Sequence, residues 1–403
     1  MTDTIFRSGD PATPPPLPLP PTLPGDAVIF AWSGATWRLA GLGLFNLCLT
    51  IVTLGIYHFW AKTEVRRRLA SSIRINGEPL EYTGTGKELF LGFLIVLIGI
   101  LLPFSLFVFA AQILMAKAAP LVVLPFYLLI WYLYGVAVYR ARRYRRSRLR
   151  WRGVRGALVG SSWTFGWHYI WTTFVNSLTY YWMTPWRDNM LHRILIQDTR
   201  FGDRAFKYRG KAGPLYGSFS LAWVGTLGML IVLAFLVWLV IAPIAKPLMD
   251  QAQMFEGPDG KMDWWLFINT YFGECALVAG LSAGFLLLAM VIYGVLWSLF
   301  HAREYRYFTS QTTLEGLRFD LNVSGFSMFW LFFSNTLMSL ATLTILSPVA
   351  EARVARYFVN RLTSTGKINF DAIQQSTAKL SRTGEGLAEA FDVEANEYFI
   401  LSI

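Results

Sequence analysis

One segment of the chain matches a catalytic motif: Gly280-Leu-Ser-Ala-Gly284 fits the G-x-S-x-G pattern of serine hydrolases. In those enzymes the serine lies on a sharp turn between a strand and a helix, and a histidine accepts its proton. Here the motif lies inside an uninterrupted apolar run, and His168 lies inside another apolar run. Ser282 and His168 would form an intramembrane hydrolase only within hydrogen-bonding distance. The interpretation we favour is that Gly280 and Gly284 allow close helix packing.

Other patterns that could hold a metal or cofactor fail on spacing. Gly84-Thr-Gly-Lys87 lacks the spacing of a phosphate loop, and Glu88 stands where a hydroxyl would bind magnesium. The histidines and cysteines are too scattered for a metal site (His58, His168, His192, His301, Cys48, Cys275). We therefore expect no metal, no cofactor and no enzymatic activity. His58, His192 and His301 adjoin aromatic or basic residues and are expected at interfaces with water or lipid headgroups.

Three arginines recur at equivalent places along the chain: Arg67, Arg193 and Arg356. Around a pseudo-symmetric core they would form a collar for phosphate headgroups, each contributing about 1 kcal/mol on an anionic bilayer. The segment from 62 to 73 has apolar residues four apart among arginines, so it is expected as a helix on the membrane surface. The simpler alternative is that these arginines only orient the chain by their charge.

Four polar residues within apolar segments are candidates for lining a pathway for a neutral or lipidic substrate: Asn46, Thr172, Asn176 and Asn335. The longest apolar runs contain no ionisable residue. Because ion and proton pathways in membranes use ionisable side chains, this absence argues against a proton-coupled pump.

The elements that must position these residues are those of a membrane protein, because 54% of the chain is hydrophobic and only 15% is charged. Four uncharged runs are long enough to be transmembrane helices: Leu89 to Ala116, Leu121 to Tyr139, Leu215 to Ala245, and Cys275 to Phe300. Three further runs carry more polar residues: Leu39 to Trp60, Gly156 to Trp186, and Leu321 to Ala350. These three either re-enter the membrane or lie at its surface, or they also cross it to give seven spans.

The three runs that carry more polar residues are called the polar-tinged runs. Each of them begins one copy of a repeated unit. Aligning Trp60 with Trp186 also aligns Arg67 with Arg193, and aligning Asn46 with Asn335 also aligns Arg67 with Arg356. We predict an all-α polytopic membrane protein of three tandem pseudo-repeats. Its parts are a disordered proline-rich tail (1–26), repeat 1 (27–148), repeat 2 (149–318), a partial repeat 3 (319–362) and a cytoplasmic tail (363–403).

Basic residues decide between the two topologies. Nine arginines fall between residues 140 and 155, directly after an apolar run, which places that junction at the cytoplasmic surface. If the three polar-tinged segments dip in and return, 33 of the 36 lysines and arginines face the cytoplasm; seven crossings would leave only 23 there. The positive-inside rule favours the first arrangement. The arginines flank apolar runs and match no nucleic-acid recognition motif, so lipid headgroups are the expected counterion.

Three signatures resemble those of the YjgN-like family of bacterial inner-membrane proteins: Thr53-Leu-Gly-Ile-Tyr-His-Phe-Trp-Ala-Lys62, Arg150-Trp-Arg-Gly-Val-Arg155 and Gly384-Glu-Gly-Leu-Ala-Glu-Ala-Phe-Asp392. The resemblance runs from about Phe30 to Val393 and implies a multi-pass protein of the bacterial inner membrane. It implies no activity, because the family's domain has no known function. It also suggests a membrane zinc peptidase as a partner.

These observations favour a protein that binds or handles anionic membrane lipid, or that organises partners in the membrane. A transporter or channel for a neutral or lipidic substrate is the alternative, and an intramembrane serine hydrolase is a remote one.

Overall fold

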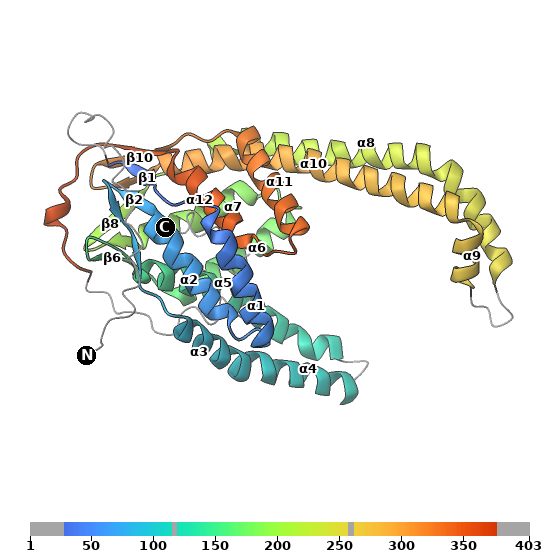
Figure 1. Ribbon diagram of the computed structural model, residues 1–403, viewed down its shortest axis with the longest axis horizontal. Coiled ribbons are helices and arrows are strands. Elements are labelled where there is room, and N and C mark those ends of the chain that lie inside the picture. Colours follow the sequence, from blue (N-terminus) through green and yellow to red (C-terminus); the bar gives the residue numbers. More distant parts are fainter. Residues whose placement is uncertain (1–27, 115–118, 257–261, 377–403) are drawn as a thin grey trace, which may run out of the picture.

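The computed structural model describes residues 28–114, 119–256 and 262–376, and it is mostly helical (Figure 1). The predicted proline-rich tail (1–26) lies outside these residues, as does the part of the C-terminal tail beyond residue 376. Short strands alternate along the chain with helical segments, here called excursions. Each excursion connects two strands that pair with one another, so both of its ends lie at the sheets.

Eight strands form an antiparallel sheet in chain order: β4 (Glu81–Tyr82), β5 (Leu149–Trp151), β6 (Val154–Leu158), β7 (Thr199–Phe201), β8 (Arg204–Tyr208), β9 (Thr312–Leu314), β10 (Leu317–Leu321) and β11 (Leu362–Thr365). A three-stranded sheet adjoins it: β1 (Phe30–Trp32), β2 (Ile73–Ile75) and β3 (Glu78–Pro79). The backbone N–H of Val28 donates to Ser364 Oγ at 3.0 Å, which joins the start of the small sheet to β11. The strands therefore curve around a common interior.

Two-residue turns join neighbouring strands at one end of the sheet: Asn76-Gly77, Arg152-Gly153, Gly202-Asp203 and Glu315-Gly316. Both residues have positive φ in three of these turns, which is the geometry that matches the twist of a β-hairpin. The prediction of an all-α fold is therefore wrong for these segments. The strands are only two to five residues long, so they carry too few residues to show an alternating pattern.

Three short helical hairpins connect strands at the opposite end: α1 (Arg38–Val52) with α2 (His58–Ser72), α6 (Ser162–Leu178) with α7 (Thr184–Gln197), and α11 (Gly325–Ala341) with α12 (Ser347–Val359). Each hairpin starts and ends at strands that pair with one another, with Trp32 opposite Ile73, Leu158 opposite Thr199 and Leu321 opposite Leu362. Both ends of every short hairpin are therefore held on the same side of the molecule.

The turns of the three short hairpins share one geometry. Thr53, Thr179 and Thr342 each donate from Oγ1 to a carbonyl one turn back and accept a backbone N–H four residues on. The next two residues of each turn have positive φ: Leu54 and Gly55, Tyr180 and Tyr181, and Leu343 and Thr344. Residues other than glycine rarely adopt this conformation, so the threonine contacts are needed to hold it.

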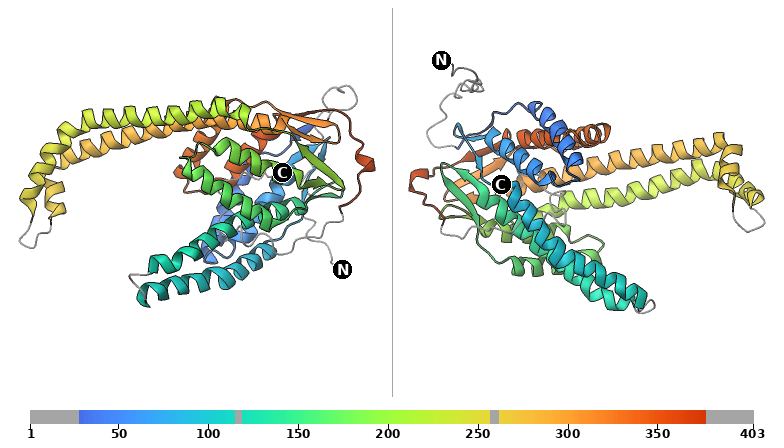
Figure 2. Two further views of the ribbon diagram at one scale, coloured as in Figure 1. Left: turned by 180° about the vertical axis from the view of Figure 1, so that it is seen from behind. Right: turned by 60° about the horizontal axis from the view of Figure 1, so that its bottom comes forward.

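Two long hairpins complete the excursions. The first consists of α3 (Gly86–Val96), the π-helix η1 (Leu97–Leu101), α4 (Leu102–Leu114) and α5 (Ala119–Arg148). The second consists of α8 (Gly213–Ala252), the 3-10 turn η2 (Gln253–Phe255), α9 (Trp264–Thr270) and α10 (Phe272–Ser310). They leave the body on the side opposite the sheet (Figure 2).

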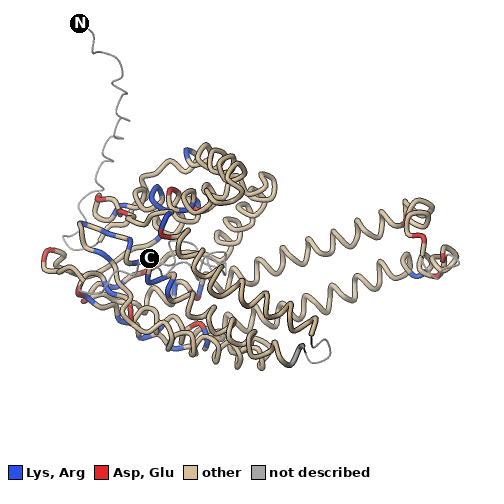
Figure 3. Tube along the Cα trace, turned by 90° about the horizontal axis from the view of Figure 1, so that it is seen from below, with Lys and Arg blue, Asp and Glu red and all other residues tan. Residues whose placement is uncertain are grey.

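The prediction of four membrane-spanning helices is confirmed in length and composition. Within the described residues, four helical stretches are long and apolar enough to cross a membrane: Gly86–Leu114, Val122–Arg148, Gly213–Phe255 and Phe272–Ser310. Charged residues gather in the body and at the far end of the α8–α10 hairpin, whereas the shafts of both hairpins are nearly free of them (Figure 3). This distribution suits shafts surrounded by lipid.

The segment from 62 to 73, expected on the membrane surface, packs against protein instead. It is part of α2, where Leu69 and Ala70 are fully buried and pack in one core with Val349 and Ala352 of α12. Its apolar face therefore contacts protein, because the third hairpin folds back against the first. Near the C-terminus, the predicted boundary at residue 363 falls inside β11, and the chain continues through the 3-10 turn η3 (Phe370–Ala372).

Candidate ligand cavity

A cavity of about 730 Å³ lies between the inner face of the strands and helices α5, α7 and α10. This volume falls in the range of small-molecule binding sites, roughly 300–1,000 Å³. Aromatic and aliphatic side chains from the strands form much of its wall: Phe30, Ile75, Trp151, Phe201, Phe206, Leu314, Phe319 and Leu321. An apolar chain can be buried along such a wall.

The segment 366–376, here called the strap, covers the sheet end of the cavity. Ile368 and Phe370 from the strap line the cavity, and the ring of Phe370 meets that of Trp151 edge-on at 4.8 Å between centroids. The strap crosses the two-residue turns, where the N–H groups of Asp203 and Gln374 bond to Gln374 O and Asp203 Oδ1. A Cβ on Gly202 would lie 2.3 Å from Gln374 O, so the close approach needs glycine there.

The other end of the cavity is polar and is built from three helices. Helix α5 contributes Arg142 and Arg146, α7 contributes Asp188 and His192, and α10 contributes Glu304 and Phe308. Each pair is four residues apart, so both members lie on one face of their helix, about one turn apart. The helices thus present two stacked layers of side chains to the cavity.

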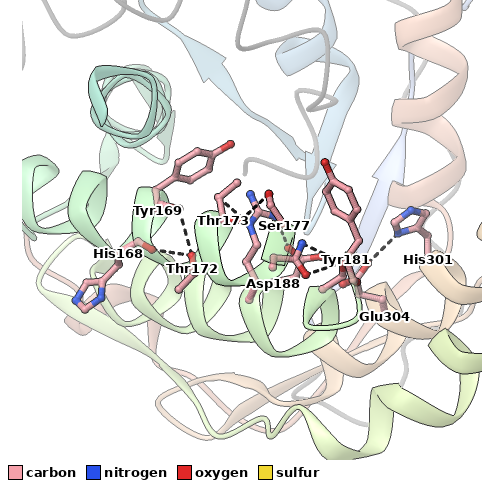
Figure 4. A network of polar contacts seen from close by, with 12 residues as sticks. His168, Tyr169, Thr172, Thr173, Ser177, Tyr181, Asp188, His301 and Glu304 are labelled. Atoms are coloured by element: carbon pink, nitrogen blue, oxygen red, sulfur yellow. Dashed lines mark hydrogen bonds and ion pairs between the residues drawn. The ribbon is translucent and has the colours of Figure 1, made fainter. Parts of the chain in front are cut away.

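Two ion pairs organise the first of these layers (Figure 4). Arg187 Nη1 lies 2.8 Å from Asp188 Oδ1, and Arg187 Nε donates to Thr173 Oγ1 at 3.1 Å. His301 Nδ1 lies 2.9 Å from Glu304 Oε2. The other carboxylate oxygen of Glu304 is buried and has no hydrogen-bond partner among the described residues. The layer therefore holds two carboxylates, one of which has an unused acceptor.

Burial sets the protonation of the two α7 side chains. It raises the pKa of Asp188 to about 7, and the neighbouring charge of Glu304 adds to this effect. Burial lowers the pKa of His192 to about 3, with Arg142 and Arg146 as further causes, so His192 is a neutral imidazole. It stacks on Phe308 with ring centroids 4.2 Å apart. Near neutral pH, Asp188 is poised between its charged and uncharged forms.

Positive charge nevertheless dominates the cavity lining. Two carboxylates face it, against five arginines: Arg142, Arg146, Arg150, Arg187 and Arg200. Arg146 is buried and donates to Leu195 O at 3.4 Å and to Thr199 Oγ1. An anion is the ligand that such a lining favours, because a buried cationic surface is stabilised by opposite charge.

The three arginines predicted as headgroup ligands lie elsewhere. Arg67, Arg193 and Arg356 are exposed on α2, α7 and α12, and none of them lines the cavity. Arg67 pairs with Glu64 at 3.2 Å, and Arg193 donates to Gly210 O at 2.7 Å.

The four predicted pathway residues are buried but do not line the main cavity. Asn176 Nδ2 donates to Thr184 Oγ1 at 3.2 Å, and Asn335 Nδ2 donates to Ala350 O at 3.3 Å, so each asparagine ties together the two helices of its own hairpin. Thr172 Oγ1 donates to its own helix at His168 O. Asn335 also borders a second cavity of about 330 Å³, which Asn46, Thr172 and Asn176 do not line.

The hydrolase motif does not form an elbow. Ser282 is exposed within the continuous helix α10, and among the described residues no hydrogen bond joins it to His168, which lies on α6 (Figure 4). The interpretation of Gly280 and Gly284 as close-packing residues is also wrong within this chain. A Cβ added to either would meet no atom within 4 Å, because α10 packs on α8 through other residues.

Sequence reasoning missed the polar end of the cavity. It placed His192 and His301 at solvated interfaces, whereas both line the cavity. One signal was present: the alignment of the repeats places Lys62, Asp188 and Glu351 at the same position, so each unit carries an ionisable residue there. Burial raises the pKa of Glu351 as well.

Comparison with known proteins agrees with the membrane architecture. The "Inner membrane protein YjgN" of Salmonella typhimurium is 40% identical over 63 residues, 16% of either chain. Proteins of the same name from Escherichia coli O157:H7 and K12 are 30% identical over 135 residues and 29% identical over 147 residues. Those two matches cover 33% and 36% of this chain, and 31% and 34% of the relatives. The chain thus matches about a third or less of these relatives' length. No solved structure matches it. Residues 28–390 match the family described as "Bacterial protein of unknown function (DUF898)", so the chain belongs to this YjgN-like family of membrane proteins.

Proposed function

We propose that this inner-membrane protein binds an anionic amphiphile, an acidic membrane lipid, in the main cavity. The observation that carries the proposal is the division of the cavity into an apolar wall and a polar end with excess arginine. Acyl chains are favourable against aromatic and aliphatic side chains, and phosphate is a preferred partner of arginine.

We also propose that four helices cross the membrane while the three short hairpins, as copies of one unit, dip into it and return. Paired strands flank each hairpin, which supports an even number of crossings for every excursion. The hairpin tips support insertion, because Leu54, Tyr180 and Leu343 are 93%, 81% and 82% exposed. Exposed apolar tips of this kind are favourable in lipid and costly in water.

The sheet and the cavity then lie on the cytoplasmic side. Positive charge supports this orientation, since 33 of the 36 lysines and arginines face the cytoplasm in this topology. The cavity would therefore receive lipid from the inner leaflet, next to the bases of the spanning helices.

Lipid that stays with the purified protein provides the test. The full chain is purified in mild detergent, and the retained lipids are quantified by mass spectrometry. We expect acidic phospholipid in the wild type and about a tenfold lower amount in the double variant Arg142→Gln, Arg187→Gln, because two charged contacts are lost.

The matched control is the double variant Arg67→Gln, Arg193→Gln, which removes two exposed arginines and should leave the retained lipid unchanged. The opposite pattern would move lipid binding to the predicted arginine collar. Equal amounts of lipid in all three proteins would overturn the cavity as a lipid site.

A further inference from the structure

The last described residues of the chain are fixed beside the main cavity. Arg155 donates from its backbone N–H to Gln375 Oε1 at 3.0 Å and from Nη2 to Ser376 O at 2.8 Å. Gln375 Nε2 donates to Gly153 O at 2.9 Å. These contacts hold Ser376 at the turn between β5 and β6, and β5 contributes Trp151 to the cavity lining. The chain beyond Ser376 therefore starts at the sheet end of the cavity.

A short acidic segment follows in the sequence and lies outside the described residues. Residues 384–392, here called the acidic segment, read Gly-Glu-Gly-Leu-Ala-Glu-Ala-Phe-Asp. They contain three carboxylates and no lysine or arginine, together with the apolar side chains of Leu387 and Phe391. The family match runs to residue 390, so most of the acidic segment belongs to the family's domain.

The linker between Ser376 and the acidic segment is long enough to reach the polar end of the cavity. Ser376 and Gly384 are eight positions apart, and an extended chain covers about 3.4 Å per residue, so the linker spans roughly 27 Å. The path along the chain from Gly153 through β5 to Arg146 on α5 is roughly 20 Å, at about 3.3 Å per residue of strand and 1.5 Å per residue of helix. The straight-line distance is no longer than this path, so the acidic segment can lie beside the arginines.

The lining of the cavity is complementary to the acidic segment. Five arginines face the cavity against two carboxylates. One of them, Arg150 on β5, has a buried Nε with no hydrogen-bond partner among the described residues. A carboxylate is a preferred acceptor for such a donor. The aromatic and aliphatic wall offers Leu387 and Phe391 an apolar surface on which to be buried.

We propose that the acidic segment docks into the main cavity of its own chain and competes there with the acidic lipid. Its carboxylates contact the arginines, and Leu387 and Phe391 contact the apolar wall. The cavity has the size of a site for one small ligand, so the segment and a lipid headgroup cannot occupy it together. Tethering gives the segment an effective concentration on the order of 1 mM, which keeps even weak contacts populated. The competition rests on the proposed function, whereas the docking does not.

Photo-cross-linking of the full chain in mild detergent tests the docking. Phe391 is replaced by p-benzoylphenylalanine, which keeps an aromatic side chain, and mass spectrometry identifies the peptides that it captures. We expect capture of β5, β6, β9 and β10, whose residues line the cavity. The double variant Arg142→Gln, Arg187→Gln should reduce capture about tenfold, because two charged contacts are lost. The matched double variant Arg67→Gln, Arg193→Gln should leave capture unchanged.

Two outcomes would overturn the docking and leave the lipid proposal in place. One is capture only of peptides that do not line the cavity, or equal capture in the two double variants. The other comes from a mixture of isotope-labelled and unlabelled protein. Cross-links between a labelled and an unlabelled chain would assign the docked segment to a second copy.

Isothermal titration calorimetry with dihexanoyl-phosphatidylglycerol, an acidic short-chain lipid, tests the competition. If the acidic segment is docked in about nine molecules of ten, only about a tenth of the cavities are open and the apparent Kd for the lipid is about tenfold higher. The triple variant Glu385→Gln, Glu389→Gln, Asp392→Asn removes the three carboxylates of the segment. It should therefore bind the lipid about tenfold more tightly than the wild type does.

The matched control removes three exposed carboxylates outside the acidic segment and should bind the lipid as the wild type does: Asp250→Asn, Glu274→Gln and Asp320→Asn. Wild-type affinity in the acidic-segment variant would overturn the competition. Cross-linking to the cavity in a protein that binds no acidic lipid would overturn the proposed function and the competition with it, and would leave the docking in place.

Discussion

At the residue scale, the charge state of Asp188 is the most sensitive feature of the cavity. Asp188 faces Arg187 from its own helix and Glu304 and His301 from α10. Burial and the charge of Glu304 favour its protonated form, and the two cations oppose them only in part. The carboxyl group is therefore held in an environment that suits it better uncharged than charged.

This environment predicts how stability depends on pH. The pKa of Asp188 rises from 3.8 when unfolded to about 7 when folded, so the folded state holds the proton more tightly. Its contribution to stability is present below pH 4 and is lost as pH rises from about 4 to 7. Asp188→Asn removes the titrating group, so the variant should not lose this stability. Without bound ligand, its gain in stability over the wild type should be roughly 2–4 kcal/mol larger at pH 8 than at pH 4.

Thermal unfolding followed by tryptophan fluorescence at pH 4 and pH 8 measures the effect in detergent. The control is Asp320→Asn, which changes an exposed carboxylate on β10. A wild type and an Asp188→Asn variant with the same difference between the two pH values would contradict the argument.

At the element scale, the spanning helices could be predicted from the sequence and the sheet could not. Twenty uncharged residues predict a helix because lipid leaves the backbone no other partner. The strands had one strong signal, Asn76-Gly77, but the later turns use Arg152-Gly153 and Glu315-Gly316, which are weaker hairpin signals. The cavity could not be predicted without the sheet, because its polar end joins helices α5, α7 and α10, which are far apart in sequence.

The strap is the element on which closure of the cavity depends. Phe370→Ala removes the ring that packs on Trp151 and lines the cavity, so it should destabilise the protein by about 2 kcal/mol, less than for a fully buried phenylalanine. It should also speed the release of bound lipid, since the sheet end loses its apolar cover.

Stopped-flow dilution of a fluorescent short-chain lipid complex measures the release rate. Asp371→Ala, an exposed change in the same turn, is the control for disturbance of the strap. Slower or unchanged release in Phe370→Ala would show that lipid leaves by another route.

At the scale of the whole molecule, the two adjoining sheets fix the arrangement of the five helical excursions in the part of the chain that the structure describes. Adjacent strands pair across every excursion, including Tyr82 with Leu149 and Tyr208 with Thr312 at the bases of the two long hairpins. A strand cannot pair with its neighbour from the other side of a bilayer. The sheet therefore couples topology to folding: a hairpin that crossed once would separate two strands and open the cavity wall.

Cysteine labelling in intact cells tests this coupling directly. After Cys48 and Cys275 are replaced by alanine, single cysteines are placed at Arg200 on β7 and at Trp265 on α9, and a membrane-impermeant maleimide is added. We expect Trp265→Cys to react, because α9 lies at the far end of the α8–α10 hairpin, and Arg200→Cys to react only after the cells are lysed. Because β7 pairs with β6 and β8, labelling of Arg200→Cys in intact cells would place the sheet outside. The cavity would then face the periplasm, and the cytoplasmic leaflet could not supply its lipid.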